Sequence, residues 1–367
     1  MKIAILGTRG IPNNYGGFEQ FAEYLALGLV KKGHDVTVYN SHTHPYQNEI
    51  WNNIKIQHIY DPENKLGAAG QFIYDFLSII NSRKKGFDII LELGYTSSSV
   101  SFGFHPKNTL VVTNMDGLEW KRSKFSAKVQ KFLQWAESLA VRKSDYLVSD
   151  SVEIKNYLNE KYDVASTYIP YGAHLFYNEN VNVLDGYGLE PYSYNMLIAR
   201  LEPENSIEII LDGVTLAGNG MPFLVIGKHE TKYGEYLKRK FNEIQNIKFI
   251  GGIYDIDILN NLRYFSNLYF HGHTVGGTNP SLLEAMASSA LLCANENEFN
   301  SSVLGDDAFY FSTVEDVAAI LLGVEYDENS EKVKNNLDKI TKLYTWENIV
   351  DQYESLFEDI SSVRQEL

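Results

Sequence analysis

A glycine-rich turn between an expected strand and an expected helix has the residue types that bind phosphate. It runs from His271 to Ala287 and reads His-Gly-His-Thr-Val-Gly-Gly-Thr-Asn-Pro-Ser-Leu-Leu-Glu-Ala-Met-Ala. The glycine pair lets the backbone approach a ligand, and Asn279-Pro280 supplies a helix N-cap followed by proline at the first helical position. Such a helix start attracts anions, and Glu284 can accept hydrogen bonds from sugar hydroxyls. The alternative is a capped core helix with its glutamate on the surface.

A second polar cluster follows an expected strand in the first half of the chain. Residues 116–122 read Asp-Gly-Leu-Glu-Trp-Lys-Arg and come directly after the strand expected at 109–115. Because open α/β sheets bind ligands at the carboxyl ends of parallel strands, Asp116 and Glu119 are candidate substrate contacts. In the alternative interpretation, Asp116 opens a turn and Glu119 has a capping role.

Two arginines also follow expected strands. Arg200 comes after the strand at 195–199, a position suited to bidentate phosphate recognition; a salt bridge between domains is the alternative. Arg9 lies in the loop after the first strand, which ends in Gly16 and Gly17. These glycines give a phosphate or a sugar room to approach, although an ordinary turn explains them equally well.

The histidines and the single cysteine do not predict a metal site. His271 and His273 alternate along a strand end, so we expect them to point to opposite faces. Cys293 is the only cysteine in the chain, which excludes a disulfide framework and fits a reducing cytoplasm.

Strands and helices alternate along the whole chain, which predicts parallel α/β architecture. The main expected strands are 3–6, 36–39, 54–59, 87–91, 109–115, 145–149, 167–170, 195–199, 223–227, 247–250 and 267–270, and the main helices are 18–32, 70–82, 123–143, 152–159, 206–217 and 346–360. The first unit is Rossmann-like, but NAD binding is not expected. Its loop lacks the G-x-G-x-x-G spacing, and the second strand ends at Asn40 where an acidic residue would bind ribose.

Length and composition predict two domains in a cytoplasmic protein. The chain has 367 residues, of which 44% are hydrophobic, enough for two separate cores. Turn residues dominate 171–193, so we expect one domain at 1–175, a second at 190–345, and a final helix at 346–367 that packs back on the first. The net charge of −15 argues against nucleic-acid binding. No apolar run approaches the length of a membrane span, and the amino terminus does not resemble a signal peptide.

The segment 121–143 is a local exception to the acidic charge. It contains seven Lys or Arg residues and one acid, Glu137, beside an apolar stripe that includes Val129. A solvated helix face is the default interpretation of this pattern, and contact with anionic lipid head groups or a diphosphate is the alternative.

Two Rossmann-like domains with phosphate-binding features in the second resemble the GT-B glycosyltransferases, and the chain resembles retaining glycosyltransferase family 4 over nearly its whole length. That family has a glutamate eight positions before Glu284, where this chain has Gly276. The family's diphosphate clamp pairs an arginine with a lysine; Arg200 is present, but the lysine position holds Asn205. The resemblance implies two doubly wound domains that face an interdomain cleft.

Four motifs resemble a narrower branch, the bacterial rhamnosyltransferases of capsule and cell-wall polysaccharide assembly. They are Gly-Thr-Arg-Gly-Ile-Pro-x-x-Tyr-Gly-Gly-Phe-Glu from residue 7, the segment 116–122, Ile-Pro-Tyr-Gly-Ala at 169–173, and the stretch 271–284. This implies transfer of L-rhamnose from dTDP-β-L-rhamnose to a sugar on a lipid diphosphate, with retention of configuration and without a metal ion or other cofactor. It also implies a peripheral location at the inner face of the cell membrane, with the basic segment 121–143 beside the acceptor.

The resemblance implies a role for each candidate residue. Arg200 and the N–H groups of 278–281 hold the donor diphosphate, Glu284 binds ribose, and Asp116 orients the acceptor or the transferred sugar without acting as a nucleophile. The implied donor-binding residues are Gly16, Gly17, Tyr254, Gly277, Thr278, Asn279, Pro280 and Ser281, and the implied acceptor-binding residues are Glu119 and Arg122.

Two other functions remain open on the sequence. A nucleotide-sugar epimerase of the same fold would also bind a diphosphate at a helix start. The second alternative is a non-catalytic nucleotide-sugar-binding protein. It would explain why Gly276 and Asn205 replace the glutamate and the lysine of that family.

Overall fold

The computed structural model describes residues 1–14, 16–122 and 124–365. It divides into two compact units: unit 1 comprises Met1–Gly172 and Trp346–Leu367, and unit 2 comprises Ala173–Thr345. Tyr15 and Ser123, which fall within the expected first loop and the expected helix 123–143, lie outside the described residues.

Unit 1 is built on a mainly parallel sheet with the strand order β3-β4-β2-β1-β5-β6-β7-β8. The strands are β1 (Lys2–Leu6), β2 (Asp35–Ser41), β3 (Ile50–Trp51), β4 (Ile54–Ile59), β5 (Ile89–Leu93), β6 (Leu110–Asn114), β7 (Tyr146–Ser149) and β8 (Thr167–Tyr168). The central strands β1 and β5 are almost fully buried and mostly apolar, as expected for parallel strands that are covered on both faces, with Glu92 as a buried acid in β5. Only the short β3 pairs in the antiparallel direction among the described strands.

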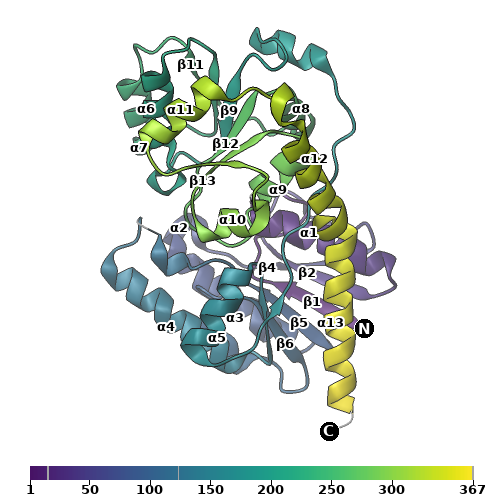
Figure 1. The fold of residues 1–367 in the computed structure, drawn as a ribbon. Coiled ribbons are helices and arrows are strands. Elements are labelled where there is room, and N and C mark those ends of the chain that lie inside the picture. Colours follow the sequence, from purple (N-terminus) through teal and green to yellow (C-terminus); the bar gives the residue numbers. More distant parts are fainter. Residues whose placement is uncertain (15, 123, 366–367) are drawn as a thin grey trace. The chain divides into compact units, whose positions relative to one another are not determined.

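Helices cover both faces of the unit 1 sheet (Figure 1). They are α1 (Gly17–Lys31), α2 (Glu63–Leu66), α3 (Ala68–Ser82), α4 (Ala127–Lys143), α5 (Val152–Tyr162) and α13 (Trp346–Gln365), with 3₁₀ turns η1 (Ser99–Phe104) and η2 (Glu119–Lys121). The helix predicted at 123–143 therefore begins later than predicted, at Ala127.

The final helix α13 packs against α1 within unit 1. A Cβ atom at Gly28 of α1 would lie 2.4 Å from Val350 Cγ2, so the glycine allows the two helices to approach closely. The Phe21 ring lies 5.4 Å from the Tyr353 ring, centroid to centroid, and Lys32 Nζ lies 2.8 Å from Glu354 Oε2. Aromatic packing and ion pairs thus hold the end of the chain on the first unit.

Unit 2 contains a parallel sheet with the order β11-β10-β9-β12-β13-β14. Its strands are β9 (Asn195–Ile198), β10 (Phe223–Ile226), β11 (Ile247–Gly251), β12 (Leu268–His271), β13 (Leu292–Asn295) and β14 (Phe309–Phe311). Its helices are α6 (Ile207–Ala217), α7 (Lys232–Lys240), α8 (Ile256–Tyr264), α9 (Pro280–Ala287), α10 (Glu298–Leu304), α11 (Val314–Gly323) and α12 (Ser330–Lys339), with shorter turns η3 (Val181–Tyr187), η4 (Pro203–Asn205), η5 (Asp327–Asn329) and η6 (Ile340–Tyr344). Helices α6 and α11 pack together on one side of the sheet, and α8, α9 and α12 lie on the other (Figure 1).

Candidate functional site

The strand order of unit 2 reverses between β9 and β12. From β9 the chain adds β10 and then β11 on one side, and it returns to add β12, β13 and β14 on the other side. Strands β9 and β12 are parallel neighbours, with Leu197 opposite Phe270. Open α/β sheets bind ligands outside the carboxyl ends of the strands at such a reversal. Arg200 and the loop 272–279 follow these two strands, so the fold brings them to one place.

The loop 272–279 is fixed by the turn η4. A Cβ atom on Gly272 would lie 2.1 Å from the carbonyl oxygen of Asn205, so a side chain at residue 272 would force the two segments apart. Thr274 donates twice to the carbonyl oxygen of Glu204, from its backbone nitrogen at 3.1 Å and from Oγ1 at 2.8 Å. These contacts order the start of the loop before any ligand binds.

Two asparagines of α10 and its N-cap hold the same loop from another side. The side-chain amides of Asn297 and Asn300 each donate to the carbonyl oxygen of His273 at 3.1 Å. The middle of the loop is more open, because no atom lies within 4 Å of where a Cβ atom of Gly276 would stand. Gly276 also has φ +138°, which side chains rarely adopt, so a glutamate at this position would strain the backbone.

Helix α9 begins as the sequence predicts. Asn279 Oδ1 accepts a hydrogen bond from the backbone nitrogen of Ser281 at 2.9 Å, and Pro280 is the first helical residue. The hydroxyl oxygens of Ser281 and Tyr269 lie 3.0 Å apart, so the Ser281 side chain already has a protein partner. The dipole and the remaining N–H groups at this helix start favour an anion.

Two cations lie at neighbouring strand ends in unit 2. Arg200 follows β9 and Lys228 follows β10, and the strands approach so closely that a Cβ atom on Gly227 would lie 2.0 Å from Ala199 O. Both side chains are exposed, and neither forms an ion pair with a carboxylate of the residues the structure describes. The sequence analysis missed Lys228, although its place directly after a strand and a glycine is the same signal that identified Arg200. Two unpaired cations at adjacent strand ends suit a ligand with two negative groups.

Asn205, five residues after Arg200, has a structural role. Its side-chain amide donates to the carbonyl oxygen of Arg200 at 2.7 Å. The residue is buried and fixes the backbone that carries the arginine. The second positive charge near this site therefore comes from Lys228, on the neighbouring strand, and Lys228 Nζ lies 5.7 Å from the ring centre of the exposed Tyr254.

Glu284 is held by a buried arginine that the sequence analysis missed. Its Oε2 atom lies 2.7 Å from NH2 of Arg263, whose side chain is 1% exposed. Arg263 also donates to Asn260 Oδ1 at 2.8 Å. The carboxylate of Glu284 is partly exposed, so this pairing fixes its orientation while leaving part of it accessible.

The prediction that His271 and His273 point to opposite faces is wrong. Their rings stack with centroids 4.3 Å apart and planes 17° apart. Strand β12 ends at His271, so the alternation of side chains does not extend to residue 273. Burial lowers the pKa of His271 well below its usual value, and the charges of His273 and Arg263 lower it further. Neither ring nitrogen of this buried, neutral His271 has a hydrogen-bond partner in the structure.

The described part of the chain contains no cluster of three or more His, Cys, Asp or Glu residues placed to hold a metal ion. It also contains no helix that is long and apolar enough to cross a membrane.

The sheet of unit 1 has its own reversal, between β1 and β5, beside the predicted glycine loop. A Cβ atom on Gly7 would lie 2.4 Å from Leu93 O, so β1 and β5 approach closely there. Glu19 Oε1 accepts from the backbone nitrogen of Arg9 at 2.8 Å. The guanidinium of Arg9 donates to both carboxylate oxygens of Glu63, at 2.9 and 2.7 Å, so this predicted cation already has a protein partner. Gly16 caps α1 and Gly17 is its first residue.

Asp116 lies after β6 in a left-handed conformation, with φ +51°. Its backbone nitrogen donates to Asn114 Oδ1 at 2.9 Å, which fixes the turn. The neighbouring strand β7 is followed by Asp150, a buried acid that the sequence analysis missed. Burial raises the pKa of Asp150 well above its usual value, and the charge of Asp116 raises it further. Two carboxyl groups thus lie near each other at these strand ends.

The two predicted acceptor contacts pair with each other. Arg122 Nε donates to Glu119 Oε1 at 2.6 Å, and both side chains are mostly buried. A ligand that uses either group must therefore bind beside this pair or break it.

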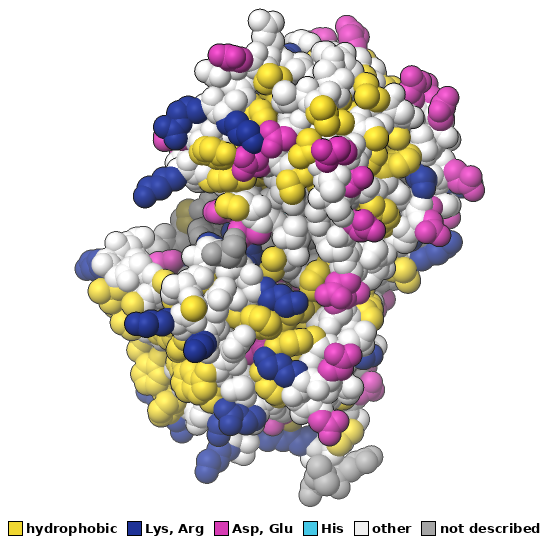
Figure 2. All heavy atoms as spheres, turned by 60° about the vertical axis from the view of Figure 1, so that its left-hand side comes forward, with side chains coloured by type: hydrophobic (Ala, Val, Ile, Leu, Met, Phe, Trp, Pro, Cys, Tyr) yellow, Lys and Arg dark blue, Asp and Glu magenta, His cyan; other side chains and the backbone are white. Residues whose placement is uncertain are grey.

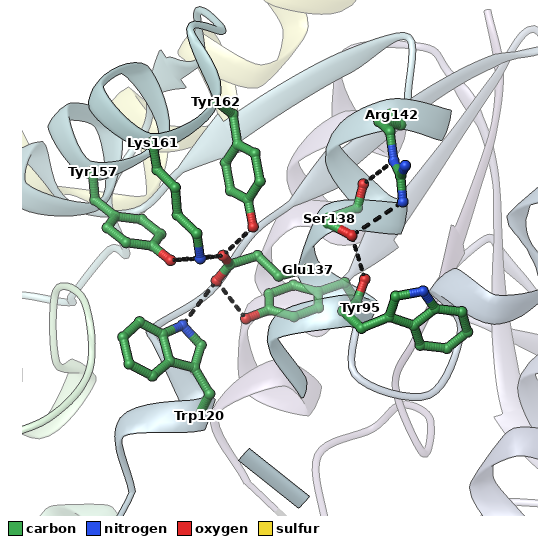
Figure 3. A network of polar contacts seen from close by, with 9 residues as sticks. Tyr95, Trp120, Glu137, Ser138, Arg142, Tyr157, Lys161 and Tyr162 are labelled. Atoms are coloured by element: carbon green, nitrogen blue, oxygen red, sulfur yellow. Dashed lines mark hydrogen bonds and ion pairs between the residues drawn. The ribbon is translucent and has the colours of Figure 1, made fainter. Parts of the chain in front are cut away.

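Glu137, the only acid of the segment 121–143, lies at the centre of a network of polar contacts (Figure 3). Its side chain is 1% exposed. Five groups donate to its carboxylate: Tyr95 OH at 3.3 Å, Trp120 Nε1 at 3.1 Å, Lys161 Nζ at 2.9 Å, and Tyr157 OH and Tyr162 OH at 2.7 Å each. Because Trp120 belongs to the segment 116–122, this network holds that segment on α4.

Comparison with protein families finds a match to the first half of the chain. Residues 1–174 match the family described as "Domain of unknown function (DUF1972)". This range covers the first part of unit 1 and ends where unit 2 begins. Comparison with curated protein sequences finds no significant match.

Solved structures match the chain over nearly its full length. Sucrose-phosphate synthase from Thermosynechococcus elongatus has a TM-score of 0.80 at 17% identity and covers 99% of both chains. Anabaena HepE in complex with UDP-glucose has a TM-score of 0.75 at 13% identity and covers 98% of this chain and all of that one. Trehalose 6-phosphate synthase from Burkholderia multivorans has a TM-score of 0.72 at 11% identity and covers 99% of both chains. The chain therefore has the GT-B fold, with two parallel-sheet domains, as the sequence predicts.

Proposed function

We propose that the chain is a retaining glycosyltransferase that uses a nucleotide-sugar donor. The observation that carries this proposal is the site at the strand reversal of unit 2, where Arg200, Lys228, a glycine loop and a helix start meet. Support also comes from the similar structures, since HepE was solved with UDP and with UDP-glucose. The motifs described above favour L-rhamnose, transferred from dTDP-β-L-rhamnose to a lipid-diphosphate-linked sugar in bacterial surface polysaccharide synthesis.

The proposed donor diphosphate binds between Arg200, Lys228 and the start of α9. The two cations and the remaining N–H groups at the start of α9 neutralise the charge that builds on the leaving diphosphate as the sugar departs. Such a site needs no metal ion, because two side chains supply the positive charge that a metal would otherwise supply.

The nucleoside is proposed to bind beside Glu284 and Tyr254. Arg263 holds the carboxylate of Glu284 in place, so its exposed part is oriented before ribose binds. Tyr254 is exposed in the turn after β11, where its ring has room to stack on the base.

The acceptor is proposed to bind to unit 1. Asp116 orients the acceptor or the transferred sugar, and the Glu119–Arg122 pair lies in the same segment. Gly16 and Gly17 let the loop before α1 approach the donor. The proposed location is the inner face of the cell membrane, where a lipid-linked acceptor is found.

A panel of nucleotide sugars, incubated with a lipid-diphosphate monosaccharide and followed by mass spectrometry, tests the proposal. We expect a deoxyhexose to be added from dTDP-rhamnose and not from UDP-glucose. Release of free nucleotide without any acceptor, together with a changed donor sugar, would instead identify an epimerase. Tight binding of a nucleotide sugar without turnover from any donor would identify a non-catalytic binding protein.

A further inference from the structure

We propose that an exposed aromatic surface of unit 1 docks on a bilayer that contains anionic phospholipids. The surface, here called the aromatic face, is formed by α3, η1 and α4. Its members are Phe72, Ile73, Phe76, Val100, Phe104, Val129, Phe132 and Trp135. This inference deepens the proposed function, on which it rests for its biological purpose, because it names the surface on which a lipid-linked acceptor would be met.

Ring contacts connect the three elements of the aromatic face. Phe104 of η1 lies 5.4 Å from Phe76 of α3, centroid to centroid. Phe72, one turn earlier on α3, lies 5.8 Å from Phe132 of α4, which in turn lies 5.6 Å from Trp135. Since Phe72 and Phe76 are neighbours on α3, these rings form a connected row across the three elements.

The outer members of the aromatic face are exposed to solvent. Phe104 is 47% exposed and Trp135 is 49% exposed. Val129, a member of the apolar stripe in the sequence, is also exposed, whereas Leu133 and Ala136 of the same helix are buried. Large apolar side chains that gather on a surface mark an interaction site, whereas scattered ones do not.

Basic side chains border the aromatic face. The exposed ones are Lys124, Lys128, Lys131, Arg142 and Lys143 on or beside α4, Arg83, Lys84 and Lys85 after α3, and Lys107 after η1. Glu137 is the only acid of α4 and is turned into the core, so the exposed side of this helix carries no acid. Figure 2 shows hydrophobic side chains gathered on unit 1 with Lys and Arg side chains beside them. The local charge is thus opposite in sign to the net charge of −15.

This combination fits an anionic bilayer better than a protein partner. Tryptophan and phenylalanine insert at the level of the lipid head groups, and lysine and arginine beside them attract anionic lipids. Lysine, in contrast, is depleted from protein–protein interfaces. A second copy of this acidic chain would meet the basic border only with a different, acidic face.

Flotation of the full-length protein with lipid vesicles tests the inference. We expect binding to phosphatidylcholine vesicles that contain phosphatidylglycerol and at least tenfold weaker binding to pure phosphatidylcholine. Phe104→Ser combined with Trp135→Ser, and separately Lys128→Glu combined with Lys131→Glu, should each weaken binding at least tenfold. Leu322→Ser and Lys334→Glu are matched controls, because both side chains are exposed on unit 2. Circular dichroism checks that every variant is folded.

The inference is overturned if the protein does not bind the anionic vesicles, or if folded variants of the aromatic face bind as the wild type does. It is also overturned if the wild type is a dimer that the Phe104–Trp135 double variant dissociates, because the face would then be a contact between copies. The two proposals fail separately. Vesicle binding without transfer from any donor removes only the proposed function, whereas transfer to a water-soluble acceptor without vesicle binding removes only this inference.

Discussion

The carboxylate of Glu284 lies 2.7 Å from the buried guanidinium of Arg263. The glutamate that the sequence assigns to ribose thus also neutralises a charge that water does not reach. Its proposed binding role and its structural role are therefore coupled, and a variant that truncates the side chain tests both at once.

Replacement of Glu284 should separate the two roles when two variants are compared. Glu284→Ala leaves Arg263 buried without its partner, and we expect it to lower the free energy of unfolding by about 3–5 kcal/mol. Glu284→Gln keeps an acceptor oxygen of the same size, so we expect a smaller loss of stability together with a raised KM for the donor. Thermal unfolding and steady-state kinetics measure the two effects. If Glu284→Ala were as stable as the wild type, the ion pair would contribute nothing to the free energy of unfolding.

The cations at the strand ends should act on the donor. Arg200→Ala and Lys228→Ala each remove a charged hydrogen-bond donor, so we expect each to lower kcat/KM for the nucleotide sugar about tenfold to a hundredfold. Lys334→Ala is the control, because this exposed lysine lies on α12. Full activity of Lys228→Ala would exclude this lysine from the diphosphate site.

The same cations predict that activity persists in a metal chelator. If the two side chains replace a metal ion at the diphosphate, EDTA should change the rate less than twofold, as measured with the wild-type protein and its preferred donor. If EDTA abolished activity and added Mg²⁺ restored it, a metal ion would be needed to neutralise the leaving diphosphate.

Gly272→Ala should disturb the loop 272–279. The new methyl group would lie 2.1 Å from Asn205 O, so the loop or η4 must move. We expect a raised donor KM and a loss of about 1–3 kcal/mol in stability, the usual cost of overpacking. Gly323→Ala is the matched control, because no atom lies within 4 Å of that position. Equal behaviour of the two variants would mean that the close approach at Gly272 is not required.

Stability should depend on pH through Asp75, a buried acid of α3. Burial raises the pKa of Asp75 to about 7, against 3.8 for the exposed group, although a hydrogen bond with Ser97 opposes the shift. Above 3.8 the unfolded chain loses this proton while the folded chain keeps it, so stability falls as the pH rises to about 7 and then levels off. We expect the loss to be roughly 4 kcal/mol at most and to be absent in Asp75→Asn. Denaturant unfolding between pH 4 and pH 8 measures it, and parallel curves for the two proteins would disprove the assignment.

Local signals in the sequence predicted many of the strands and helices, and also the start of helix α9. The strand at 54–59 is found with the predicted bounds, and Asn279-Pro280 begins α9 as its capping chemistry requires. Both depend on neighbouring residues only. The turn after β6 and the loop after β12 were found for the same reason, since glycine and polar residues follow buried strands there.

The partners of the site residues could not be predicted in the same way. Arg263 and Glu284 are far apart in sequence and meet only because α8 packs beside α9. The sequence alone indicates that Glu137 is a surface acid on a basic helix. The structure shows that it is buried, because α5 packs on α4 and its Tyr157 and Lys161 donate to the carboxylate. The alternation of side chains along a strand does not apply to His273, because β12 ends two residues earlier, at His271. Each of these errors arises from tertiary packing or from a strand end that the local pattern does not specify.

The most direct test of the central claim compares the wild type with the Arg200→Ala, Lys228→Ala double variant. Each is incubated with dTDP-β-L-rhamnose and a lipid-diphosphate monosaccharide, and the product is examined by mass spectrometry and NMR. The account predicts one added deoxyhexose in a β linkage with the wild type, and little or none with the variant. An acceptor that the wild type leaves unchanged, or equal transfer by the two proteins, would contradict it.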